Sequence, residues 1–94
     1  ENLTTKYDIN YDIKYYDVIN VTTDDILNVR EFPGHQNNKV AKIPHFEKCV
    51  EFLGDYRLNE SQVWVKVQYQ NIQGWVNSFY LVRSEHCDEE DEVE

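Results

Sequence analysis

Two cysteines and three histidines are the side chains of this 94-residue sequence best suited to act as nucleophiles or metal ligands. His45 and Cys49 lie four positions apart, and His86 and Cys87 are adjacent. A Cys–His nucleophile pair needs hydrogen-bond contact and a third group that orients the histidine. Neighbouring residues in an acidic terminal segment are a poor setting for this arrangement, and no pair of carboxylates lies in a recognisable catalytic motif. We therefore predict no catalytic residues and no enzymatic activity.

The same residues leave alternatives open for the cysteines. Two His and two Cys would suffice for a zinc site if the two segments met in space. Their spacing matches no zinc motif, and we predict no metal and no other cofactor. The cysteines either remain free thiols, as in a reducing compartment, or form a disulfide. In the chain-entropy model, a disulfide that closes the loop between Cys49 and Cys87 would stabilise the fold by about 4 kcal/mol.

Strand patterns dominate the elements that must position these side chains. No segment keeps a helical period for ten residues, and Tyr, Phe, Trp, Val and Ile are abundant. Residues 5–15 alternate Thr, Tyr and Ile with polar residues, which predicts a strand or extended arm. Pro33-Gly34 and the Asn pair after it predict a loop over residues 32–38, and Asp55 to Gln62 reads as a polar loop. The other expected strands are Val18 to Val21, Ile26 to Arg30, Lys39 to Ile43, Cys49 to Leu53, Val63 to Tyr69, Ile72 to Asn77 and Leu81 to Arg83, with a 3₁₀ turn at Ser78 to Tyr80. The sequence therefore predicts an all-β fold, a small barrel or sandwich.

Charge is distributed unevenly along the chain and excludes some partners. The net charge is −9, and residues 85–94 contain seven acidic residues but no Lys or Arg. The remainder is close to neutral, so it offers no basic face for nucleic acid or for an anionic membrane. No apolar run approaches the roughly 20 residues of a membrane span. We expect neither a nucleic-acid partner nor membrane insertion.

Two segments carry a family resemblance. The first reads Asp25-Ile-Leu-Asn-Val-Arg30, followed by Pro33 and Gly34, and the second reads Trp64-Val-Lys-Val-Gln-Tyr69, then Gly74-Trp-Val-Asn77 and Tyr80-Leu81. In this order and spacing they resemble the signatures of bacterial SH3 domains. The resemblance covers roughly residues 16–83. It implies a small SH3-like barrel of five to six short strands. Residues 1–15, an extra N-terminal strand or arm, and residues 84–94, an acidic tail, lie outside the resemblance.

The resemblance also predicts the interior of the barrel and its location in the cell. Gly74 would lie where a strand passes so close to its neighbour that a side chain would clash. Members of the family are usually exported from the bacterial cytoplasm. The resemblance therefore favours a disulfide between Cys49 and Cys87 and a periplasmic or secreted protein. The side chains expected in the core are Leu27, Val29, Val65, Val67, Val76 and Leu81.

Aromatic side chains are the best candidates for a binding site. Trp64 lies on the strand face opposite the valines, so we expect it to be partly exposed. Eukaryotic SH3 domains hold extended peptides with a Trp and a Tyr at positions that Trp64 and Tyr80 match. Phe32 would flank them. Arg30 is a further ligand candidate, or else a structural ion pair with Asp24 or Asp25. The alternative for both aromatic residues is that they only cover the barrel end.

Three functional hypotheses follow from these features. The first is a non-catalytic binding module of an exported bacterial protein, which recognises a peptidoglycan stem peptide or a protein segment. The second is a structural domain that mediates assembly without a cell-wall ligand, and the third is the targeting domain of a larger cell-wall hydrolase. We expect a monomer or a weak dimer.

Overall fold

The computed structural model describes residues 13–87 of the chain. Within these residues the backbone forms seven β-strands and one 3₁₀ turn, which confirms the predicted all-β fold. The elements are β1 (Tyr15–Val18), β2 (Ile26–Arg30), β3 (Lys39–Pro44), β4 (Val50–Asn59), β5 (Gln62–Tyr69), β6 (Ile72–Asn77), η1 (Ser78–Tyr80) and β7 (Leu81–Arg83).

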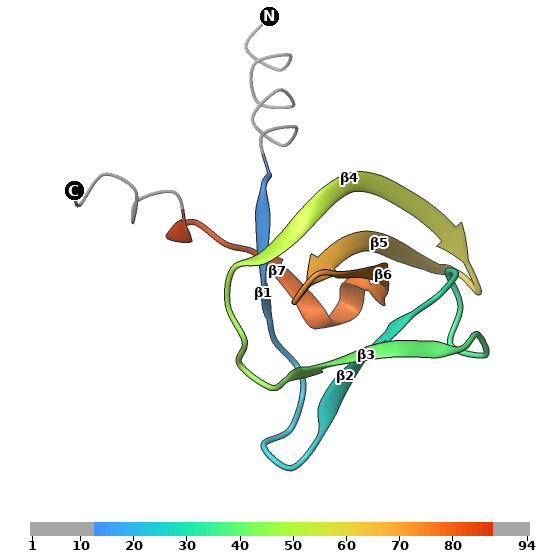
Figure 1. Cartoon of the computed structure of the whole chain (residues 1–94), viewed down its shortest axis with the longest axis horizontal. Coiled ribbons are helices and arrows are strands. Elements are labelled where there is room, and N and C mark those ends of the chain that lie inside the picture. Colours follow the sequence, from blue (N-terminus) through green and yellow to red (C-terminus); the bar gives the residue numbers. More distant parts are fainter. Residues whose placement is uncertain (1–12, 88–94) are drawn as a thin grey trace, which may run out of the picture.

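The strands form one curled antiparallel sheet in the order β3-β2-β6-β5-β4-β1-β7. In Figure 1, β4 arches over β5, and β2 and β3 lie below them. β4 pairs with β1 at its start and with β5 along its length, and its register with β5 shifts between Phe52 and Tyr56. Such a bulge bends a strand and increases its twist. The bend lets a single sheet wrap into a small half-barrel.

The barrel interior is filled by alternate side chains from most of the strands. Successive strand residues point to opposite faces, so Val65 and Val67 face inward while their neighbours face outward. All six side chains expected in the core are buried, which confirms that prediction. The cluster of buried residues comprises Tyr16, Val18, Leu27, Val29, Ile43, Val50, Val65, Val67, Val76 and Leu81.

Gly74 allows β6 to pass close to β2. A Cβ atom built on Gly74 would lie 2.5 Å from Cγ1 of Val29 and 2.7 Å from the carbonyl oxygen of Arg30. Both distances are shorter than real carbon contacts allow. The predicted close approach at this glycine is therefore confirmed.

Several predicted boundaries are wrong. The first described strand ends at Val18 rather than running to Val21, because the chain turns at Asn20, where φ is +64°. The expected polar loop over residues 55–62 is instead the second half of β4 and a tight turn at Glu60 and Ser61. The loop at residues 32–38 and the turn at η1 are confirmed. Of the predicted N-terminal strand or arm, residues 1–12 lie outside the described residues, as do residues 88–94 of the acidic tail.

A disulfide joins Cys49 to Cys87, as predicted. Cys49 precedes β4 and Cys87 follows β7, and these two strands flank β1 on either side. The buried carboxylate of Asp17 in β1 accepts a hydrogen bond from the backbone N–H of Cys49 at 3.0 Å. The disulfide uses both sulfur atoms, so the four-ligand zinc alternative does not form in this structure.

β1 and β7 also bring the entry and exit of the barrel together. Tyr16 is paired with Arg83, and the backbone N–H of Ser84 donates to the carbonyl of Tyr15 at 3.0 Å. Within residues 13–87, no helix is long and apolar enough to cross a membrane.

Candidate functional site

A cavity of about 320 Å³ opens on the outer face of the sheet. Its residues come from β2, β5 and β6, from η1 and from the loops on either side of β2. We call this cavity the groove. It is lined by Asn20, Val21, Thr22, Asp25, Ile26, Leu27, Asn28, Arg30, His35, Trp64, Asn77 and Tyr80.

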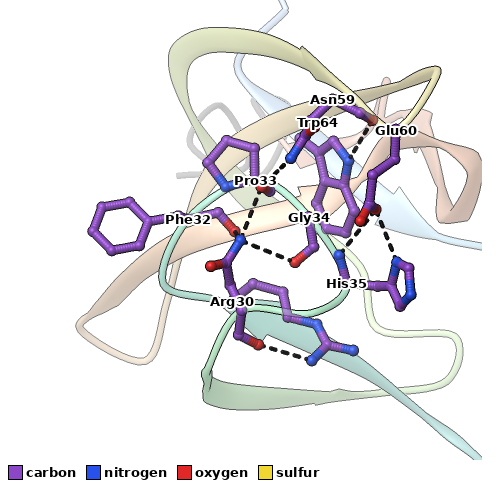
Figure 2. Close-up of polar contacts among 9 residues, drawn as sticks. Arg30, Phe32, Pro33, Gly34, His35, Asn59, Glu60 and Trp64 are labelled. Carbon is purple, nitrogen blue, oxygen red and sulfur yellow. Dashed lines mark hydrogen bonds and ion pairs between the residues drawn. The ribbon is translucent and has the colours of Figure 1, made fainter.

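Three of the four predicted ligand-binding residues line the groove: Trp64, Tyr80 and Arg30. The fourth, Phe32, does not. Its side chain is 58% exposed and in Figure 2 points away from Trp64 and His35. The structure therefore brings together residues that are up to 50 positions apart, and it excludes the loop phenylalanine from this set.

Trp64 is buried in the groove rather than partly exposed. It lies on the face opposite the valines, as expected, and outside the core cluster that the valines form. Only 3% of its surface is accessible, however, so the predicted exposure is wrong. Groove residues from three other elements, His35, Asn77 and Tyr80, lie around it. Its indole Nε1 donates to the carbonyl of Asn59 at 3.3 Å, which fixes the orientation of the ring.

Two asparagines position the wall that contains Tyr80. Oδ1 of Asn77 accepts from the backbone N–H of Phe79 at 2.9 Å and caps η1. Nδ2 of Asn20 donates to the carbonyl of Phe79 at 2.8 Å, which fastens the loop after β1 to the same turn. Tyr80 is half-buried and contacts the core cluster. The tyrosine therefore reaches the groove from a turn that two asparagine side chains hold at the backbone of Phe79.

Arg30 contributes a cationic group without a carboxylate partner. Its Nη1 donates to the carbonyl of Asn37 at 3.0 Å. The alternative of an ion pair with Asp24 or Asp25 does not form. Oδ1 of Asp25 accepts from the backbone N–H of Ile26, and Oδ1 of Asp24 accepts from Thr22. Among residues 13–87, the ion pairs are those of His35 with Glu60 and of Arg57 with Asp55.

The loop between β2 and β3 is fastened to the β4–β5 turn. Nδ2 of Asn59 donates to the carbonyl of Pro33 at 2.7 Å, and Nδ1 of His35 lies 2.8 Å from Oε1 of Glu60 (Figure 2). The same carboxylate accepts from the backbone N–H of His35. These hydrogen bonds from His35 lower the pKa of the Glu60 carboxyl. The loop wall of the groove thus depends on contacts with a distant hairpin.

The groove continues past this contact. A second hollow of about 440 Å³ shares His35, Trp64, Asn77 and Tyr80 with it. The hollow adds Glu60, Gln62 and Phe79 at its far end. An extended chain therefore has a longer path over the tryptophan than the first cavity alone would give.

Asn28 has an oxygen that is buried without a partner. Its Oδ1 makes no hydrogen bond to any described residue, and the residue lines the groove. An unsatisfied buried acceptor costs roughly 1–3 kcal/mol. Sequence reasoning missed this residue along with Asn20, His35 and Asn77. Asn28 and Asn77 lie within the two family signatures and His35 directly follows Gly34, which is the signal that could have found these three, whereas Asn20 carries no such signal.

No protein-family model matches the chain, and neither does a curated protein or a solved structure. The groove offers amide and hydroxyl groups, the half-buried ring of Tyr80 and the guanidinium of Arg30, whereas the buried Trp64 adds little accessible surface. These are groups that can hold a polypeptide backbone and its polar ends.

Proposed function

We propose that the protein is a non-catalytic binding module of the bacterial SH3 type, which holds an extended peptide in the groove. The observation that carries the proposal is the meeting of Trp64, Tyr80 and Arg30 in one cavity. The sequence pattern of residues 16–83 also predicts a site of this kind. Aromatic surfaces with convergent polar groups are typical of small binding sites.

The chemistry of the groove supports a peptide rather than a purely apolar ligand. Asparagine side chains line the groove at three positions, 20, 28 and 77, and each amide both donates and accepts. A peptide backbone offers the matching N–H and C=O groups at regular intervals. The unpartnered Oδ1 of Asn28 supports a ligand N–H donor at this point.

The proposed ligand of an exported bacterial protein is a peptidoglycan stem peptide, with a segment of a partner protein as the other source. Cosedimentation with purified cell wall tests the first source. We expect the protein to sediment with cell wall and to be released by soluble stem peptide. Cosedimentation without such release indicates another wall component and contradicts the proposed ligand.

Asn28→Ala is the variant that separates binding from folding. It removes a buried oxygen that has no hydrogen bond in the described part of the chain, so the free energy of unfolding should not fall and should rise by up to about 1–3 kcal/mol. A ligand N–H left without its acceptor should weaken binding about tenfold. Phe46→Ala is the control, because Phe46 is 62% exposed and lines neither hollow. If both variants bind as tightly as the parent protein, the groove is not the site.

An exposed apolar face on the β4–β5 hairpin favours assembly as a second candidate function. Leu58 lies opposite Val63 in the sheet register, and their exposed fractions are 76% and 43%. Tyr56 is exposed on the same face. Contiguous exposed apolar side chains mark interaction surfaces. Sedimentation equilibrium of the parent protein and of Leu58→Ser tests this: a dimer that dissociates in the variant supports assembly, and monomers in both contradict it.

A further inference from the structure

The groove runs along β2 with opposite charges near its two ends. Asp25 immediately precedes β2, Arg30 is its last residue, and both line the cavity. Five steps of extended chain at about 3.3 Å each separate their Cα atoms by about 17 Å. A peptide of about five residues has the same length when it is extended.

Arg30 is suited to receive a carboxylate. Arg30 is half-buried, and its guanidinium donates one hydrogen bond to the carbonyl of Asn37, which leaves other donors for a ligand. No carboxylate of residues 13–87 lies in ion-pair contact with it. Guanidinium groups bind carboxylates with two parallel hydrogen bonds, so this end of the groove matches the C-terminus of a peptide.

Asp25 supplies the complementary charge at the other end. Its carboxylate is exposed, accepts a hydrogen bond from the N–H of Ile26, and forms no ion pair within the described part of the chain. A ligand ammonium group would be attracted here. The imidazole of His35 and the carboxylate of Glu60, also at the groove, already contact each other at 2.8 Å.

Asn28 lies between these two charges. It faces outward from β2, as Arg30 does, since residues two apart on a strand share a face. Its Oδ1 has no hydrogen-bond partner among the described residues and is closed off from solvent, so it becomes an acceptor for an N–H in the middle of a bound chain when the side chain turns toward the groove. The groove thus offers an anion, an acceptor and a cation in sequence along one strand.

From this arrangement we infer that the groove selects short peptides with both ends free, placing the amino group at Asp25 and the carboxylate at Arg30. The inference rests on the proposed function and adds to it the direction, the length and the required end groups of the ligand. A peptide that is internal to a longer chain would lose both end contacts. A stem peptide whose amino end is joined to the glycan strand would lose the contact at Asp25, so the soluble stem peptide with a free amino end should bind more tightly than the wall-bound form.

Pentaalanine in four forms tests this inference: with both ends free, N-acetylated, C-amidated, or blocked at both ends. The readout is the chemical shift of backbone amides in the full chain during NMR titration. We expect each blocked end to weaken binding about tenfold, as for the loss of a partly exposed charged hydrogen bond. Trialanine is too short to reach both charges, so blocking its second end should have no further effect.

Charge variants assign each end. Arg30→Gln should abolish the preference for a free carboxylate and keep the preference for a free amino group. Asp25→Asn should do the reverse. Lys42→Gln is the matched control, because Lys42 is exposed on β3, outside the groove, and its loss changes the net charge by the same amount as that of Arg30. Equal losses in Arg30→Gln and Lys42→Gln would show that only total charge matters, and would overturn the inference.

The outcomes also separate this inference from the proposed function. If all four forms of pentaalanine shift the groove amides with equal affinity, the groove holds peptides without reading their ends, and only the inference fails. If no form shifts the amides that line the groove, the inference and the peptide-binding function fail together. Binding with the opposite assignment of ends in the two variants would overturn the proposed direction.

Discussion

Gly74 illustrates how one residue sets the distance between two strands. β6 lies beside β2, and the missing side chain at Gly74 is what leaves room for Val29 and for the backbone at Arg30. Arg30, which lines the groove, is paired with Trp75 next to Gly74, so the short distance between β2 and β6 also positions Arg30.

Gly74→Ala should therefore destabilise the fold. The added methyl group would meet a core side chain and a backbone oxygen, and overpacking of this kind costs about 1–3 kcal/mol. Urea denaturation measures the loss. Gln73→Ala, at the exposed neighbouring position in the same strand, should change the free energy of unfolding by less than about 0.5 kcal/mol. Equal stability of Gly74→Ala and the parent would mean that β6 can move away from β2 at little cost.

Trp64→Ala should destabilise the protein as a core substitution does. The side chain is 3% exposed and donates a hydrogen bond to Asn59, so its removal should cost about 3–5 kcal/mol. Denaturation of this variant beside Tyr80→Ala, whose side chain is only half-buried, checks the expectation. A loss below 1 kcal/mol for Trp64→Ala would indicate that the groove collapses around the missing ring without penalty.

At the scale of elements, the loop between β2 and β3 depends on the β4–β5 turn. Pro33 and His35 in the loop are held by Asn59 and Glu60 in the turn. Glu60 and Ser61 have φ values of +57° and +61°, the left-handed conformation that two-residue hairpin turns prefer. The β4–β5 turn thus places Asn59 and Glu60 where both can contact the loop between β2 and β3.

The lowered pKa of Glu60 makes this contact sensitive to acid. A carboxyl whose folded pKa is depressed stabilises the fold above its unfolded pKa, and that contribution is lost as pH falls through the folded value. NMR titration should place the Glu60 carboxyl below its usual range, with the His35 amide shift following the same curve. His35→Gln should raise the pKa of Glu60, and His45→Gln should leave it unchanged. Identical Glu60 titrations in all three proteins would contradict the assigned contact.

Local patterns predicted the regular strands well and the long-range contacts poorly. β5 was evident because Val65 and Val67 alternate with polar neighbours, and η1 followed from its position before the closing strand. β4 was cut short because Asp55, Arg57 and Asn59 look like a loop, although an outer strand face tolerates such residues. The burial of Trp64 could not be predicted from its own strand, because its neighbours Arg57, Asn59 and Asn77 belong to β4 and β6 and reach it only in the folded sheet.

At the scale of the whole molecule, the disulfide clamps both flanks of β1. Cys49 and Cys87 themselves lie outside the strands, so no strand pairing would hold these two segments together without the disulfide. Replacing both by alanine should lower the free energy of unfolding by about 4 kcal/mol, a large part of the roughly 5–15 kcal/mol typical of a domain. Denaturation of the oxidised protein, the reduced protein and the double variant measures this. If reduction leaves the midpoint unchanged, or if native protein takes up two alkyl groups at cysteine without reductant, the expectation is wrong.

The pairing of β1 with β7 has a consequence for protein engineering. The polypeptide enters and leaves the barrel on neighbouring antiparallel strands, where Tyr15 and Ser84 share a backbone hydrogen bond. The ends of the barrel are therefore about 5 Å apart, the spacing of adjacent strands. The barrel could therefore be inserted as a domain into a surface loop of a host protein whose two loop ends are separated by about this distance. The groove of the barrel and the fold of the host should both be preserved.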